Sequence, residues 1–476
     1  MRRHILFYLL CIWAQLTWAQ EQPLVRVPYP GGPCTMYRLY LKDKDLVHSP
    51  FSTARPEAYL SVRSIERRKR QGLKVDESDL PVALAYIDSV RRVAGIDVVG
   101  RSKWNNTLLV RVRKEAQVER LGRLPFVKGM VRVFASPDSV TTRQRTRYSA
   151  HFRKYEVSRH RYGASAEQIK MLGGDRLHAK GYKGEGMMIA VLDAGFMNAD
   201  SIAALGTIRV AGVHDFVVPA STNVYTEMGH GTKVLSTMGV NTPYYYIGTA
   251  PAAQYLLLRC EDERTESLAE EDYWAEAAEY ADSMGVDVIN SSLGYHAFDD
   301  TTTSHRASDL DGRTALISRT ASMLASKGIV CVCAAGNDGD AEWQKVNVPA
   351  DATGVLTVGS VDDKGRRASF SSVGPTADGR IKPDVMAQGK PAMVVLPSGV
   401  IDEDYGTSFS APQVAGMVAC LWQALPHLTA QQVIDAVRQS GSNRLHPDYQ
   451  CGYGVPNFWE AYRGMKREES KVKNRK

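Results

Sequence analysis

The chain has 476 residues, of which 44% are hydrophobic and 23% charged, and its formal net charge is +7. This length allows two or three domains, and the composition excludes collagen-like, low-complexity and largely disordered proteins. Residues 20–150 carry 25 Lys and Arg against 13 Asp and Glu, whereas residues 151–465 carry 26 against 37. These two parts can therefore attract each other. No nucleic-acid-binding motif accompanies the basic residues, so we expect no nucleic-acid partner.

The first 19 residues have the pattern of a signal peptide. A basic start, Met1–His4, precedes an apolar run over residues 5–16, and Ala19 supplies a small residue at the usual cleavage position. The run is short for a bilayer span, so removal after Ala19 is favoured over a retained N-terminal anchor. We therefore expect an exported protein (secreted, periplasmic or at the cell surface) with no stable membrane insertion after signal removal.

Residues 34–134 have the pattern of a small α/β unit, and the order of their periodicities suits a ferredoxin-like arrangement. The expected strands cover residues 36–41, 107–113 and 130–134, and the expected helices cover residues 57–70, 82–93 and 115–121. Residues 136–165 then carry seven Lys and Arg among few bulky apolar residues. This is typical of an exposed linker that a protease can reach, and an ordinary solvated loop is the alternative.

From residue 165 onward, continuous apolar strands alternate with helices. The expected strands cover residues 187–192, 252–258, 286–289, 329–332 and 352–361, and the expected helices cover residues 273–283, 314–326, 413–425 and 431–440. Such strands belong to parallel sheets that helices cover on both faces. Residues 151–465 therefore predict a doubly wound, mostly parallel α/β domain. The charged tail, residues 466–476, is expected to be disordered.

Seven cysteines occur, and Cys11 leaves with the signal. The even number that remains permits disulfides in an exported protein, but the spacing identifies no pairing. Cys331 and Cys333 face the same side of one expected strand, where a bond between them is geometrically unfavourable. We expect these two to be buried free thiols. The cysteines show no metal-ligand spacing.

The heptapeptide Gly406–Pro412 places Ser408 among small residues just before a buried helix. A serine there is exposed at the end of an element, beside backbone N–H groups that attract negative charge. Pro412 suits the first helical turn, where its missing N–H is not needed. These features favour a nucleophile, and a plain helix cap is the alternative role for Ser408.

Polar residues also follow three expected strands, at the sheet edge where sites form in doubly wound folds. Asp193 ends the first strand, residues 290–294 follow the second, and Asn337 follows the third. His230 lies in Gly-His-Gly-Thr, ahead of an apolar stretch. A serine nucleophile needs a histidine base, an acid that orients the base, and fixed donors for the oxyanion. Each residue alone also fits a structural role, but together they supply all four parts.

The chain resembles the subtilisin-like serine protease family in its bacterial exported form. The matching segments, which span roughly residues 185–460, are Ile189–Gly195, Gly229–Thr232, Ser291–Gly294, Ala334–Asn337, Asp378–Val385 and Gly406–Pro412. The resemblance implies Asp193, His230 and Ser408 as the catalytic triad, and Asn337 with the Ser408 N–H as the oxyanion hole. It also implies that the first substrate pocket is lined by Ser291, Ser292, Leu293, Gly294, Ala334, Ala335 and Gly336.

The resemblance further implies a serine endopeptidase made as a proenzyme, with residues 20–150 as a propeptide that assists folding and blocks the cleft. Its partners are then peptide substrates and its own propeptide, and we expect a monomer. The chemistry needs no cofactor. The resemblance allows structural calcium, which is frequent in the family, but no calcium-binding loop is recognisable in the sequence. Lys233 departs from the family, many of whose members carry a second histidine there.

Two other functions compete with this one. A catalytically silent scaffold would have lost a triad member, and none is missing here. An α/β-hydrolase esterase would show a Gly-x-Ser-x-Gly elbow around Ser408, which is absent. The acidic stretch over residues 261–272 fits either a preference for basic substrates or a solvated loop.

Overall fold

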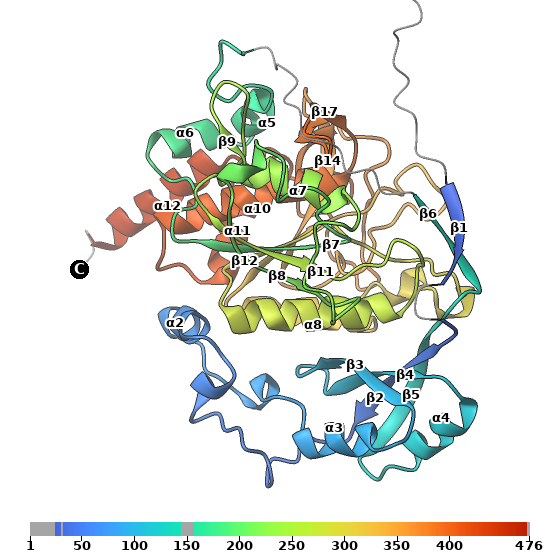
Figure 1. Ribbon diagram of the computed structural model, residues 1–476. Helices are drawn as coiled ribbons and strands as arrows, with labels where there is room; N and C mark the ends of the chain where they lie inside the picture. The colour runs from blue at the N-terminus through green and yellow to red at the C-terminus, as the bar shows by residue number, and fades with distance from the viewer. Residues whose placement is uncertain (1–23, 30–31, 144–156, 474–476) are drawn as a thin grey trace, which may run out of the picture.

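The computed structural model describes residues 24–29, 32–143 and 157–473, and a seven-stranded sheet forms its centre (Figure 1). The strand order is β15-β14-β13-β12-β7-β11-β8, and every neighbouring pair is parallel. The doubly wound prediction is therefore confirmed. The strands are β7 (Met188–Asp193), β8 (Arg209–Asp215), β11 (Gln254–Arg259), β12 (Val288–Ser291), β13 (Val330–Ala334), β14 (Val355–Asp362) and β15 (Val385–Lys390).

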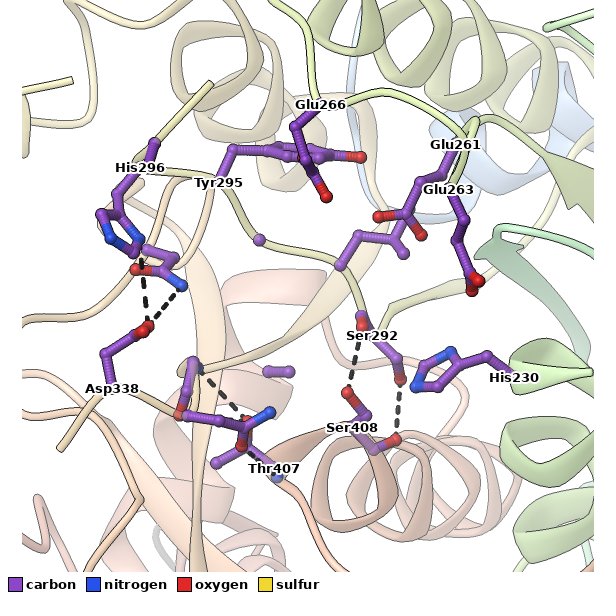
Figure 2. Close-up of a pocket in the computed structure, with 17 residues that line it drawn as sticks. His230, Glu261, Glu263, Glu266, Ser292, Tyr295, His296, Asp338, Thr407 and Ser408 are labelled. Atoms are coloured by element: carbon purple, nitrogen blue, oxygen red, sulfur yellow. Dashed lines mark hydrogen bonds and ion pairs between the residues drawn. The ribbon is translucent and has the colours of Figure 1, made fainter. Parts of the chain in front are cut away.

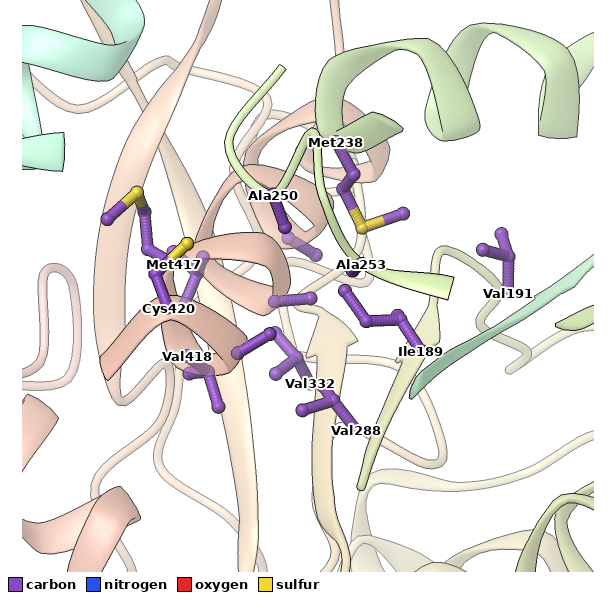
Figure 3. Packing of buried hydrophobic residues seen from close by; sticks show 14 of the residues in the cluster. Ile189, Val191, Met238, Ala250, Ala253, Val288, Val332, Met417, Val418 and Cys420 are labelled. Atoms are coloured by element: carbon purple, nitrogen blue, oxygen red, sulfur yellow. The ribbon is translucent and has the colours of Figure 1, made fainter. Parts of the chain in front are cut away.

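Helices cover both faces of this sheet, which explains why its inner strands are largely apolar, whereas the edge strand β8 is partly exposed. In β7, Ile189 and Val191 belong to one core, whereas Ala190 and Leu192 belong to the other. Figure 3 shows part of the first core, where strand residues lie beside Val418 of α10. The first layer contains α7 (His230–Gly239), α10 (Thr407–Ala424), α11 (Ala430–Gln439) and α12 (Phe458–Lys473), and the second contains α8 (Ala269–Met284) and α9 (Leu316–Met323).

Smaller elements complete this domain. Two short helices precede β7, and two antiparallel strand pairs lie outside the main sheet. They are α5 (Ala166–Met171), α6 (Gly174–Ala179), β9 (Asn241–Thr242) with β10 (Tyr246–Ile247), and β16 (Ala392–Val395) with β17 (Ile401–Asp404).

The N-terminal part folds as a separate antiparallel sheet with the order β3-β4-β2-β5. With two helices between β2 and β3 and one between β4 and β5, this is the ferredoxin-like strand order that the sequence predicts, with one additional helix. The elements are β2 (Thr35–Leu41), α2 (Val62–Arg70), α3 (Leu84–Arg91), β3 (Ile96–Ser102), β4 (Thr107–Val112), α4 (Glu115–Gly122) and β5 (Val127–Ala135). The sheet and α2 pack below α8 in Figure 1.

Buried ion pairs join the two domains at α8. Arg38 of β2 contacts Asp272 at 2.7 Å, and Arg67 of α2 contacts Asp282 at 2.6 Å. Arg68 contacts Asp282 as well, at 2.9 Å. All of these side chains are at most 5% exposed. The basic N-terminal part and the acidic larger part therefore attract each other through specific contacts, as their opposite net charges predict.

Some segments differ from the sequence prediction. Strands β8 and β15 of the central sheet were not predicted. Strand β3 was not predicted, because its polar and apolar residues do not alternate regularly and it pairs only with β4. The tail is not disordered over residues 466–473: α12 continues through them, because Tyr462 and Met465 pack against the core and Glu469 contacts His427 at 2.9 Å. Within the expected linker, β6 (Ser139–Arg143) pairs with β1 (Leu24–Pro28).

Some predictions fall outside the described residues, namely the signal peptide with its cleavage after Ala19, residues 144–156 of the linker and the last three residues of the tail. Among the helices of the described ranges, none is long and apolar enough to cross a membrane. The six cysteines that the structure describes are free, and the sulfurs of Cys331 and Cys333 lie 3.6 Å apart. The expectation of buried free thiols at these two positions is confirmed.

Candidate active site

Asp193 and His230 form a hydrogen bond at the carboxyl end of the central sheet. Asp193 is the last residue of β7 and is fully buried, and His230 is the first residue of α7. Asp193 Oδ1 accepts from His230 Nδ1 at 2.8 Å and from the N–H of Ala194 at 2.9 Å. Because Nδ1 carries the proton in this bond, Nε2 of the neutral ring is left as an acceptor.

The glycines on either side of His230 are required by close packing. A Cβ at Gly231 would lie 2.4 Å from the carbonyl oxygen of Gly195, and a Cβ at Gly229 would lie 2.2 Å from the ring of Pro397. The N–H of Gly231 also donates to the Gly195 carbonyl at 3.0 Å. This contact anchors the start of α7 against the turn after β7, which brings His230 to Asp193. The Gly-His-Gly pattern is therefore more than a plain turn.

Two opposing effects act on the pKa of His230. Burial of the ring disfavours the imidazolium ion, but the charge of Asp193 and its hydrogen bond outweigh burial, so the pKa is raised above its ordinary value of 6.5. Lys233 lowers it slightly from the next turn of α7, where its ammonium group contacts Asp404 at 2.7 Å. The net environment therefore favours a charged ring, which suits a group that takes up a proton.

Ser408 is the second residue of α10, and its side chain contacts Ser292. Ser408 Oγ donates to the carbonyl oxygen of Ser292 at 3.2 Å, and Ser292 Oγ donates to the carbonyl oxygen of Ser408 at 2.9 Å. In Figure 2 the ring of His230 points toward this pair of serines. Among the described residues the hydroxyl of Ser408 is hydrogen-bonded to Ser292 rather than to His230, although both line one cavity.

The position of Pro412 differs from the prediction. Helix α10 begins at Thr407, so Pro412 is the sixth helical residue rather than part of the first turn. A proline there has no N–H to donate to the carbonyl of Ser408, four residues earlier. The hydroxyl of Ser292 donates to that carbonyl instead, which explains how the helix accommodates an internal proline next to Ser408.

The carboxamide of Asn337 is held in one orientation by Thr407. Asn337 Oδ1 accepts from the N–H of Thr407 at 2.9 Å and from its hydroxyl at 3.0 Å. With the oxygen engaged, the NH₂ group is the end of the amide that remains available to a ligand. Asn337 lines the same cavity as His230 and Ser408, so this NH₂ group is a donor at the cavity wall.

A cavity of about 500 Å³ brings most of the predicted site residues together (Figure 2). Of the predicted pocket residues, it is lined by Ser292, Leu293, Gly294, Ala334 and Gly336. Ser291 and Ala335 lie outside this lining. The hydroxyl of Ser291 faces α8 and accepts from Trp274 Nε1 at 2.9 Å, because alternate residues of a strand face opposite sides.

Other residues of the cavity wall were not singled out from the sequence as site residues. On one side, Asn347 donates to Asp338 at 2.9 Å, and the ring of His296 is stacked on Trp343. The opposite side carries acidic residues from the loop after β11. The additional lining residues are Glu261, Glu263, Glu266, Tyr295, His296, Ala297, Asp338, Asn347 and Thr407. The acidic stretch gave a signal in the sequence. Tyr295, Asp338 and Thr407 adjoin predicted site residues in the chain, but their residue types gave no signal of their own.

Comparison with protein families accounts for most of the chain. Residues 184–454 match the subtilase family, Peptidase S8, and residues 36–150 match the Peptidase S8 propeptide domain of Bacteroidota. The second match covers the ferredoxin-like domain and the beginning of the linker.

Individual relatives agree with this assignment. The chain is 32% identical to subtilisin NAT of Bacillus subtilis subsp. natto over 306 residues, which are 63% of this chain and 72% of that protein. It is 33% identical to subtilisin DY of Bacillus licheniformis over 294 residues, 61% of this chain and 95% of the relative. Subtilisin of Bacillus pumilus is 31% identical over 296 residues, which are 62% of this chain and 97% of that protein. This chain belongs to the subtilase family of serine endopeptidases and carries that family's propeptide domain.

Proposed function

We propose that the protein is exported as a proenzyme and cleaves peptide bonds through an acyl-enzyme formed on Ser408. The observation that supports this most directly is the 2.8 Å hydrogen bond between Asp193 and His230, next to a cavity that His230 shares with Ser408 and Asn337. This arrangement supports the roles of acid for Asp193, base for His230, nucleophile for Ser408 and oxyanion donor for Asn337.

The proposed reaction begins when the Ser408 hydroxyl turns from the Ser292 carbonyl toward His230. Oγ attacks the peptide carbonyl carbon, and Nε2 of His230 takes the hydroxyl proton while Asp193 stabilises the imidazolium ion. The imidazolium then protonates the leaving amine, the peptide C–N bond breaks, and water hydrolyses the acyl-enzyme by the reverse proton transfers. Catalytic hydrogen bonds are often incomplete without substrate, so the present Ser408 contact is compatible with this role.

Two donors are positioned for the developing oxyanion. One is the NH₂ group of Asn337, whose orientation Thr407 determines. The other is the backbone N–H of Ser408, which lies in the first turn of α10, where N–H groups have no partner within the helix. The positive end of the helix dipole at this turn adds to their effect.

The substrate is proposed to bind as an extended strand between Ser292–Gly294 and Ala334–Gly336. Glycines in both segments leave room for the substrate backbone, because they carry no side chain. A Cβ at Gly294 would lie 3.0 Å from Asn347, and Gly336 has a φ of +108°, which side-chain-bearing residues rarely adopt. Backbone hydrogen bonds to such a strand are compatible with many substrate sequences. We propose no cofactor for this chemistry and a monomeric enzyme.

Maturation is proposed to require cleavage between the ferredoxin-like domain and the subtilase domain. The propeptide match and the buried ion pairs at α8 support an N-terminal domain that binds its own enzyme before removal. The arginine-rich segment between the domains is where we expect the cut, made either by this enzyme or by another.

A serine-directed fluorophosphonate tests the assignment. We expect it to label the mature protein at Ser408, and we expect the variants Ser408→Ala and His230→Ala to lose on the order of 10⁶ in turnover. Near-normal hydrolysis by Ser408→Ala would refute the proposal. N-terminal sequencing of exported protein then identifies the signal and propeptide cleavage bonds, and an uncut Ser408→Ala chain would show that cleavage is autocatalytic.

A further inference from the structure

Three glutamates converge on the acidic side of the cavity. Glu261 follows β11, Glu270 is the second residue of α8, and Glu266 lies in the loop between them. One carboxylate oxygen from each lies within 4.8 Å of the others. In Figure 2, Glu261 and Glu266 point toward each other beside the ring of Tyr295. Two of the three thus reach the cavity, and the third lies behind them.

Glu270 is buried without the partners that a buried carboxylate normally has. Glu270 is 1% exposed, and neither of its carboxylate oxygens has a hydrogen-bond partner in the described part of the chain. The hydroxyl of Tyr295 lies near enough to favour the charged form, yet it also makes no hydrogen bond of normal geometry there. An unpaired buried carboxylate is costly, so this position needs a compensating group.

No basic side chain of the described residues forms an ion pair with Glu261, Glu266 or Glu270. The nearby arginines are engaged elsewhere: Arg264 contacts Asp262 at 2.5 Å, and Arg259 contacts Asp215 at 3.0 Å. Three carboxylates this close together, with no basic partner in the described ranges, repel one another, so a cation that binds among them relieves this repulsion.

We infer that Glu261, Glu266 and Glu270 bind a divalent cation of the size of calcium. The donors are all carboxylate oxygens, which hard cations prefer. Calcium binds oxygen at about 2.3–2.6 Å, so two oxygens on one ion lie up to about 5 Å apart, and the observed spacing fits without rearrangement. Magnesium binds oxygen at about 2.0–2.1 Å and demands near-ideal octahedral geometry, which suits ligands from a loop less well.

The cation would connect three points of one wall of the cavity. It would hold the loop after β11 against the start of α8, so it would order the acidic wall while removing most of its negative charge. A lysine or arginine side chain of a substrate is the other cation that could enter here. It carries one charge against three carboxylates, and Glu270 lies behind the cavity surface, so the divalent ion compensates the site better.

The test measures calcium binding to the full chain carrying Ser408→Ala. Isothermal titration calorimetry gives the affinity and the number of ions, and the melting temperature with and without calcium gives the stabilisation. We expect one calcium ion to bind and to raise the melting temperature. Glu270→Gln and Glu261→Gln, each added to that chain, should weaken binding by about tenfold or more. Glu263→Gln removes a charge from the same wall but none of the three ligands, so it should bind calcium almost normally. Because Ser408 is absent throughout, the result does not depend on the proposed hydrolysis.

Several results would overturn the assignment. One is the absence of any calcium-dependent heat or melting shift at millimolar calcium. Another is an equal loss of affinity in Glu263→Gln, which would indicate diffuse attraction to an acidic surface. If Glu270→Gln does not fold, Glu261→Gln decides alone, and unchanged affinity in it rejects the site. Binding of an arginine-containing peptide that requires Glu261, with no calcium binding, would reassign the cluster to substrate side chains.

Discussion

Ser292 and Ser408 exchange two hydrogen bonds, each hydroxyl donating to the other residue's carbonyl oxygen at 2.9 and 3.2 Å. This contact joins the segment after β12 to the start of α10. It also supplies the donor that Pro412 cannot, because the Ser408 carbonyl would otherwise receive the N–H of residue 412. Ser408 is therefore positioned by the segment after a neighbouring strand as well as by its own helix.

Replacing Ser292 by alanine should leave the Ser408 carbonyl without a donor. We expect the free energy of unfolding to fall by about 1–3 kcal/mol, the cost of a buried unsatisfied carbonyl, and turnover to fall with it. Adding Pro412→Ala should restore part of the loss, because residue 412 then donates within the helix. Urea unfolding of the two single variants and the double variant measures this coupling. Additive effects in the double variant would contradict the proposed link.

The raised pKa of His230 predicts an acid limit to activity. Nε2 can take the serine proton only when the ring is neutral, so activity should fall as the pH drops through this pKa, which lies above the ordinary value of 6.5. Asp193→Asn removes the charge that raises the pKa. The pH at which activity falls should therefore decrease, while turnover falls on the order of 10⁴-fold. The pH profile of kcat/KM in both enzymes provides the measurement. If the pH at which kcat/KM falls is the same in both enzymes, a group other than His230 controls the loss of activity in acid.

Asn337→Ala should reduce kcat by about 10²–10³-fold with little change in KM, because its NH₂ group is proposed to act only on the transition state. Thr407→Val removes one of the two donors that orient the amide, so it should cause a smaller loss of the same kind. Steady-state kinetics with one peptide substrate compares the two. A loss carried mainly by KM would instead place Asn337 in ground-state binding.

Asp282→Asn tests the contact between the N-terminal domain and α8. The carboxylate is buried, but the charges of Lys103, Arg67 and Arg68 outweigh burial and hold its pKa well below the ordinary value. Neutralising it leaves the buried Arg67 without its carboxylate partner, whereas Arg68 keeps Asp79 at 3.0 Å. We therefore expect the proenzyme to lose about 3–5 kcal/mol of stability at this contact. Urea unfolding and hydrogen exchange of α2 should detect this loss.

The same contact predicts a response to acid. Because the pKa of Asp282 is depressed in the folded state, its contribution is present above the unfolded pKa and is lost as the pH falls through the folded one. The contact should therefore persist through mild acidification. Asp300→Asn is the matched control, since its pair with Arg132 joins the same domains at an exposed position and should matter little. Equal effects of the two variants would contradict the role given to burial.

Much of the fold could be predicted from local patterns. The inner strands of the central sheet are apolar on both sides because both faces are buried, as the two separate cores of β7 show, whereas the edge strand β8 is largely exposed and was not predicted. Strand β3 escaped prediction because an edge strand of mixed polarity lacks such a pattern. The tail was expected to be disordered because charged residues dominate its composition. It is helical because Tyr462 and Met465, just before it, pack against the core.

By itself, the sequence determined which chemical groups are available and in which motifs: the serine before a buried helix, the histidine between glycines, and the aspartate and asparagine at strand ends. Only the tertiary structure decided how they are oriented. It turned Ser291 away from the cavity, engaged Asn337 Oδ1 with Thr407, and gathered Glu261, Glu266 and Glu270 around one point. The physical reason is that motifs depend on the local backbone, whereas hydrogen-bond partners and electrostatic fields depend on residues distant in the chain.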